Sequence, residues 1–373
     1  PIRDFWIFTG LLVDYMEALF LFLFGNNWNS HLAHGSFMNL IATIGVYFFL
    51  KELSLSRNSR IFYSICFSTL CYPVSGTPFA YLHAYIFSLL AIFILILAIK
   101  NQNRFLWFFF PFMCFFAFFS MQTPTAYILV ILFILLTCYF IKSKDVKNLK
   151  YFVSGSILSL FLFILFLLIT NTPITSFIYQ YILFPLTIGE ARISSDELAY
   201  VGLIDQINFK RLVGEFKWLH IFLFPLIYIS IINRKKNTSF VNLFNLTIIL
   251  CTLAFFFNQL ITANQVYIFS LIPVLAATLH INLIKLNLNP KLFYLIFFIV
   301  LFSTVKYHFR FNIDRKFLDL ENIDKNNAVS ANLIHKNFNN LKWISKFDEP
   351  NNEVKILKNA VKIIENDKRQ IAL

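Results

Sequence analysis

The feature that most constrains this chain is a series of ten apolar stretches. A helix that crosses a bilayer needs about 20 mostly apolar residues. The whole chain is 58% hydrophobic and only 14% charged, with a mean hydropathy of +0.68, whereas about 25% of the residues in soluble domains are charged. The sequence therefore predicts an all-α, polytopic transmembrane bundle of about ten spans. The expected spans are 31–50, 61–72, 79–99, 105–120, 125–141, 151–170, 218–232, 240–257, 265–284 and 292–307.

Lysine and arginine occupy every second loop between these stretches. Basic residues follow the first, third, fifth, seventh and ninth stretch, whereas the loops 26–30, 73–78, 121–124 and 258–264 contain none. Cytoplasmic loops of membrane proteins are enriched in Lys and Arg. We therefore expect the basic loops in the cytoplasm, with the loop 171–217 and the tail after residue 307 outside. This topology also accounts for the net charge of +13, so nucleic acid is not an expected partner.

The composition divides the chain into three regions. Residues 1–30 are expected to be the end of an external loop and a juxtamembrane helix, residues 31–307 the bundle, and residues 308–373 a small soluble external tail. In the tail, apolar residues recur at helical spacing from Val354 to Ile364. The chain begins at Pro1, without Met and inside a loop. We therefore expect a fragment, with at least one helix ahead of Pro1.

The opening stretch combines acidic residues with a short apolar run. Asp14 and Glu17 are three residues apart, so on a helix they share a face. The run is shorter than a span, which predicts a helix lying on the membrane surface with its acids toward water and its Leu and Phe toward lipid. The alternative is a spanning helix whose acids face the bundle interior. A second amphipathic helix is expected at the start of the loop 171–217, ended by Pro185 and Gly189.

Charged side chains outside the basic loops gather on the external side. No span contains a buried series of ionisable residues, which ion-coupled transporters usually have. An external charged patch above an apolar bundle suits a lipid-linked substrate, because Arg can bind a phosphate and a carboxylate can act as a general base. The residues of this patch are Arg3, Asp4, Asp14, Glu17, Glu190 and Arg192.

Histidines offer a second set of candidates. His31 and His34 are three residues apart at the outer mouth of the first span, a spacing compatible with a metal pair but more typical of two polar residues at the interface. His83 lies inside a span, where a polar residue is either functional or hydrogen-bonded between helices. The sequence fixes no cofactor, although a divalent metal ion is compatible with these residues. The five cysteines form no CxxC pair.

The order of parts resembles bacterial members of the GT-C glycosyltransferase superfamily. These polytopic enzymes take a sugar from a polyprenyl-phosphate donor, as the lipid A aminoarabinose transferases and the protein mannosyltransferases do. The similar parts are Pro1-Ile2-Arg3-Asp4-Phe5, the helix that ends at Leu23-Phe24-Gly25, the stretch 171–193 with Phe184-Pro185, and Asn264–Phe269 followed by Ile272-Pro273. This chain differs at Thr9-Gly10-Leu11-Leu12, where some members of the superfamily have His-Pro-Pro-Leu.

The resemblance implies a bacterial inner-membrane glycosyltransferase that moves a sugar from a polyprenyl-phosphate carrier to a lipid or glycan acceptor on the external face. It places the family's catalytic acid pair ahead of Pro1 and leaves Asp4 as an active-site acid. Arg192 and Arg3 would bind the donor phosphate, and Asp14, Glu17 and His83 would line the acceptor side. The alternatives are a transporter or lipid flippase, a polymerase or ligase of lipid-linked glycans, and a membrane scaffold.

Overall fold

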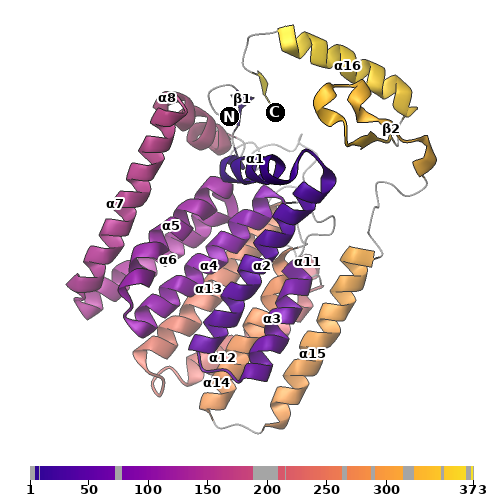
Figure 1. The fold of residues 1–373 in the computed structure, drawn as a ribbon. Helices are drawn as coiled ribbons and strands as arrows, with labels where there is room; N and C mark the ends of the chain where they lie inside the picture. The colour runs from indigo at the N-terminus through magenta and orange to yellow at the C-terminus, as the bar shows by residue number, and fades with distance from the viewer. Residues whose placement is uncertain are drawn as a thin grey trace.

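The chain folds as a helical bundle in a computed structural model that describes residues 5–7, 9–71, 78–187, 209–214, 216–262, 267–286, 290–313, 323–345, 348–366 and 371–372. Every predicted apolar stretch contains a helix (Figure 1). These helices are α2 (Trp28–Glu52), α3 (Arg57–Cys71), α4 (Ala80–Asn101), α5 (Arg104–Ser120), α6 (Gln122–Ser143), α7 (Val146–Ile169), α12 (Lys217–Ile232), α13 (Ser239–Thr262), α14 (Leu271–Lys285, extended at its start by the 3-10 turn η2, Tyr267–Ser270) and α15 (Lys291–His308, followed by the π-turn η3, Phe309–Ile313).

Seven of the helices in the described part of the chain are long and apolar enough to cross a membrane. They indicate a membrane-embedded, all-α protein. Three of the ten helices, α3, α5 and α12, have 15, 17 and 16 residues, which is shorter than a typical span. A bundle of ten complete spans therefore stays a prediction.

The helices alternate in direction, so the charged loops separate by side. The C-terminal ends of α2, α4, α6, α12 and α14, and the starts of the helices that follow them, lie at the end of the bundle opposite α1 (Leu11–Phe24), as Figure 1 shows. The basic residues that are expected in the cytoplasm lie at these helix ends or in the turns next to them. At this end Lys100 donates a hydrogen bond to the Glu52 carbonyl, which joins the last turns of α4 and α2.

Helices α4 and α14 form the centre of the bundle. Nearly all of their side chains are buried, whereas α7 and α15 lie at the edges (Figure 1) and expose many apolar side chains. Some polar side chains inside the bundle pair across helices, which avoids the cost of an unpaired polar group in an apolar interior. Asn245 and Asn282 exchange two amide hydrogen bonds of 2.9 Å, and Tyr85 bonds Ser270 at 2.7 Å.

Helix α1 lies across one end of the bundle, not through it (Figure 1). Gly10 precedes it with φ 79°, a conformation that favours glycine, and its N–H donates to the Ser120 carbonyl at 3.0 Å. Gly25 ends α1 with φ 86°, and the Asn27 side chain then accepts from the Ser30 N–H to begin α2. These two glycines set the sharp turns that fold α1 over the bundle. Its 14 residues are too few to cross a bilayer.

The exposed face of α1 is apolar toward its end, where Leu19, Phe22, Leu23 and Phe24 are exposed. This agrees with the orientation expected for a helix at a membrane surface. Glu17 differs from the expectation, because it faces two histidines instead of water. The side chain is only 22% exposed.

The second amphipathic segment is also helical. It consists of α8 (Ile174–Phe177) and the π-helical turn η1 (Ile178–Leu183), and the helix continues to Thr187. Pro185 therefore does not end the helix, as the sequence had suggested, and Gly189 lies outside the described residues. The 6-residue helix α11 (Phe209–Gly214) precedes α12.

The tail forms a small unit beyond the α1 end (Figure 1). Helix α16 (Pro350–Asn366) packs Val354 against Ala331 and Ile334, next to a two-stranded antiparallel pair. The chain ends also meet, because β1 (Phe5–Trp6) pairs in parallel with β4 (Ile371–Ala372). The other elements of the tail are η5 (Lys325–Asn327), β2 (Val329–Ser330), η6 (Ala331–Leu333), η7 (Lys336–Phe338) and β3 (Lys342–Trp343).

Candidate functional site

Four side chains from three helices form a polar cluster under α1, which we call the Glu17 cluster: Glu17, His31, His34 and His83. Glu17 accepts from both histidines of α2, with Oε1 2.9 Å from His31 Nδ1 and Oε2 2.7 Å from His34 Nδ1. The sequence spacing explains this, because His31 and His34 occupy one face of α2, directly beneath the turn from α1.

His83 extends the cluster from α2 to α4. Its Nε2 lies 2.9 Å from His34 Nε2, and its Nδ1 lies 2.9 Å from the Phe79 carbonyl oxygen. Both rings are fully buried, with exposed fractions of 0%. On the α1 side the Phe20 ring stacks on His34, with centroids 5.1 Å apart. A continuous hydrogen-bonded chain therefore runs from a partly exposed carboxylate on α1 to the first turn of α4.

Asp14 lies one turn before Glu17 and outside the cluster. The residue is exposed, yet the protein around its carboxyl group disfavours the charged form and raises the pKa of Asp14 to about 6. The exposure limits the energetic effect of this shift. Asp14 thus presents a carboxyl group of unusually high pKa at the α1 end of the bundle.

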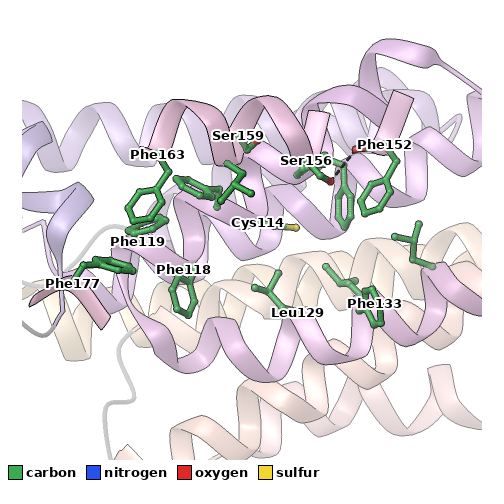
Figure 2. A pocket seen from close by; sticks show the side chains of 16 residues that line it. Cys114, Phe118, Phe119, Leu129, Phe133, Phe152, Ser156, Ser159, Phe163 and Phe177 are labelled. Carbon is green, nitrogen blue, oxygen red and sulfur yellow. Dashed lines mark hydrogen bonds between the residues drawn. The ribbon is translucent and has the colours of Figure 1, made fainter. Parts of the chain in front are cut away.

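An apolar groove of about 470 Å³ lies between α5, α6 and α7 (Figure 2). This volume is within the usual range of small-molecule sites. Figure 2 shows aromatic rings along its length and two serine side chains of α7. The serine hydroxyls donate to carbonyls of their own helix, Ser156 to Phe152 and Ser159 to Gly155. The lining residues are Phe110, Pro111, Cys114, Phe115, Phe118, Phe119, Leu129, Leu132, Phe133, Leu136, Phe152, Ser156, Ser159, Leu160, Phe163 and Phe177.

The groove reaches the end of the bundle that carries α1. Its lining residues Phe119 and Phe177 pack in one cluster with Leu11, the first residue of α1, and with Tyr181. The Tyr181 hydroxyl donates to the Phe119 carbonyl at 2.7 Å, which holds η1 against the end of α5. An apolar groove therefore ends beside the helix that carries Asp14 and Glu17.

The residues predicted from the sequence divide into two groups. Glu17 and His83 meet through His34, and Asp14 lies one turn from Glu17 on the same helix. Arg3, Asp4, Glu190 and Arg192 lie outside the described residues, so the roles predicted for them stay predictions. Sequence reasoning missed the bond between Glu17 and the histidine pair. The only signal was that all three residues lie near the start of the first predicted span.

The sequence allowed His31 and His34 to be either a metal-binding pair or two polar residues at the interface. In the part of the chain that the structure describes, no three His, Cys, Asp or Glu side chains are grouped to hold a metal ion. Instead, the two imidazoles face separate oxygens of Glu17 at hydrogen-bond distances.

Comparisons of the chain with protein-family models, with curated proteins and with solved structures gave no match.

Proposed function

We propose that this protein is a membrane glycosyltransferase that moves a sugar from a polyprenyl-phosphate donor to a lipid or glycan acceptor. The observation that carries the proposal is the apolar groove that ends beside α1. The polyprenyl tail of such a donor is apolar throughout, so it suits a space lined by aromatic and aliphatic side chains. The phosphate and the sugar would then lie at the α1 end.

The side of the membrane follows from the charge distribution. The basic links gather at the end opposite α1, and basic loops remain in the cytoplasm. We therefore place α1, the loop 171–217 and the tail on the external face of a bacterial inner membrane. A lipid-linked donor is available on that face, where soluble nucleotide sugars are not.

The proposed reaction is a substitution at the anomeric carbon of the sugar. The oxygen of an acceptor hydroxyl forms a bond to this carbon as the bond to the donor phosphate oxygen breaks. The hydroxyl proton passes to the Asp4 carboxylate, and polyprenyl phosphate leaves with the bonding electrons, held by Arg192 and Arg3. Asp14 and Glu17 line the acceptor side, with His83 behind Glu17. These assignments to residues 3, 4 and 192 rest on the sequence.

The proposal is tested with the full-length protein in liposomes that contain a polyprenyl-phosphate-linked sugar and a crude lipid acceptor fraction. We expect labelled sugar to move to the acceptor with release of polyprenyl phosphate. A general base contributes about 10²–10⁴-fold to a rate, so Asp4→Asn should slow transfer by about that factor.

Two variants on α7 test whether the groove binds the donor. Ser156 lines the groove, whereas the neighbouring Ile157 is 64% exposed on the outside of the bundle. Ser156→Phe should raise the donor KM by filling the groove, and Ile157→Phe should not. Equal KM values for the two variants would rule out the groove as the donor site. Movement of intact donor across the bilayer without transfer would refute the transferase and favour a flippase.

A further inference from the structure

The directions of the hydrogen bonds in the Glu17 cluster can be derived from one fixed end. The Phe79 carbonyl oxygen can only accept, so the His83 Nδ1 atom 2.9 Å away must carry a proton. Two further short contacts follow along the chain, His83 Nε2 to His34 Nε2 at 2.9 Å and His34 Nδ1 to Glu17 Oε2 at 2.7 Å. Each contact needs one proton between its two heavy atoms.

A count of protons gives the central point. Three contacts need three protons, but two neutral imidazoles supply only two, and an ionised Glu17 supplies none. The third proton can sit on Glu17, His34 or His83, and the count is the same in each case. Because Glu17, His34 and His83 are coupled, this proton is shared by the three side chains and is not assigned to one of them.

Loss of the third proton would leave one contact broken. The broken contact can be any of the three: the His34 Nδ1 lone pair would face the Glu17 carboxylate, two imidazole lone pairs would face each other, or the His83 Nδ1 lone pair would face the Phe79 carbonyl. Both rings are fully buried and Phe20 covers His34, so water cannot replace the lost bond. A buried polar atom without a partner carries a desolvation penalty.

We propose that Glu17, His34 and His83 form a proton-binding site, and that the bound proton fastens α1 to α2 and α4. The site does not depend on the proposed glycosyl transfer. It links a titration to the position of the helix that covers this end of the bundle.

The other titratable groups around the site do not change the count. Neutral His31 can donate from Nδ1 to Glu17 Oε1 while keeping its second nitrogen outside the chain. Asp14 lies one turn away on α1 and is exposed. On α4, the Tyr85 hydroxyl bonds the Ser270 hydroxyl at 2.7 Å, outside the row of three contacts.

Helix α5 also packs against α1, through its C-terminal end at Ser120. Its charged residue Arg104 lies at the opposite end of the helix, about 24 Å away at 1.5 Å per residue.

The sign of the pH dependence follows from linkage. With α1 released, the row of contacts is interrupted at Glu17, so the released state binds the third proton less tightly than the attached state does. The attachment of α1 therefore weakens as pH rises, by at most tenfold per pH unit.

The test measures hydrogen–deuterium exchange of α1 amides in the full chain in detergent, at pH 6.0 and 8.5, corrected for the intrinsic exchange rate. The Asp14→Asn background removes the separate titration of Asp14. In this background, we expect the protection of α1 to fall by at least about threefold between the two pH values.

Glu17→Gln, added to this background, should abolish the pH dependence while α1 stays protected. The amide N–H can donate to His34 Nδ1 and the amide oxygen can accept from His31, so no extra proton is needed. His83→Gln gives an independent test of the same count if Glu17→Gln does not fold. Its amide N–H can donate to His34 Nε2, so it should also remove the pH dependence.

The proposal is overturned if protection in the Asp14→Asn background is the same at both pH values. It is also overturned if the folded Glu17→Gln or His83→Gln variant retains the pH dependence, because the titrating group would then lie elsewhere.

Discussion

The His34 Nδ1 atom lies 2.7 Å from Glu17 Oε2, and this contact joins the helix that covers the bundle to the first long helix of the bundle. Charge-assisted hydrogen bonds of this length are among the stronger side-chain interactions. The geometry therefore makes Glu17 the main polar anchor of α1.

Glu17→Ala should destabilise the folded protein, because it leaves buried His34 without its partner on α1. The expected loss in the free energy of unfolding is about 1–3 kcal/mol. Denaturant titration in detergent measures it, with Asp14→Ala as a control on the exposed part of the same helix. Equal stability of Glu17→Ala and the wild type would show that the contact contributes nothing.

Asp14 should make stability depend on mildly acidic pH. Its pKa is raised in the folded protein from 3.8 to about 6, so the folded state binds the proton more tightly than the unfolded state does. Stability from this group is complete below pH 3.8 and is lost as pH rises through about 6. Asp14→Asn should therefore stabilise the protein at pH 8, by less than about 1 kcal/mol because the residue is exposed. Melting temperatures at pH 5 and pH 8 check the sign, and a variant that is less stable than the wild type at pH 8 would contradict it.

Gly155 should be essential for the packing of α7 on α5. A Cβ atom at this position would lie 2.1 Å from the Phe108 carbonyl oxygen, which belongs to the backbone and cannot turn away. Gly155→Ala should cost about 1–3 kcal/mol through forced separation of the helices, and it should widen the groove between them. Gly214→Ala is the matched control, because nothing lies within 4 Å of its added Cβ. Similar melting temperatures for the two variants would show that α7 does not pack as closely as described.

The reciprocal amide pair of Asn245 and Asn282 should couple α13 to α14. Each side chain both donates to and accepts from the other. Polar pairs between helices in membrane proteins contribute about 0.6 kcal/mol on average and up to about 1.7 kcal/mol. A double-mutant cycle with alanine at each position measures this coupling energy. Strictly additive single-variant effects would indicate that the pair is not formed.

The sequence predicted helices well and their contacts poorly. A helix occupies every apolar stretch, since uninterrupted apolar residues specify helices wherever water is excluded. The separation of basic links from α1 could also be read from loop composition. The stretches predicted for α5 and α12 differ from these helices by one residue, whereas α3 begins four residues earlier than predicted, because its first turn consists of the polar residues 57–60.

The Glu17 cluster depends on the two turns that set how α1 lies over α2. The hydropathy pattern predicted that α1 is short, but it does not predict which side chain of α2 faces Glu17. His83 comes from a helix about fifty residues later, so its bond to His34 depends on helix packing. The groove likewise depends on the distance between α6 and α7, which composition leaves undetermined. The pairing of Phe5–Trp6 with Ile371–Ala372 joins the two ends of the chain and had no sequence signal.

The most direct test of the account is photo-crosslinking with a polyprenyl phosphate that carries a diazirine in its isoprenoid tail. Added to the full-length protein in liposomes, it should label α5, α6 and α7 at groove residues such as Phe115 and Phe163, and excess unlabelled polyprenyl phosphate should suppress this labelling. Ser156→Phe should reduce labelling, whereas Ile157→Phe should not. Labelling that is spread evenly over exposed apolar residues of α15, such as Phe298 and Phe302, and that excess carrier does not suppress, would contradict the account.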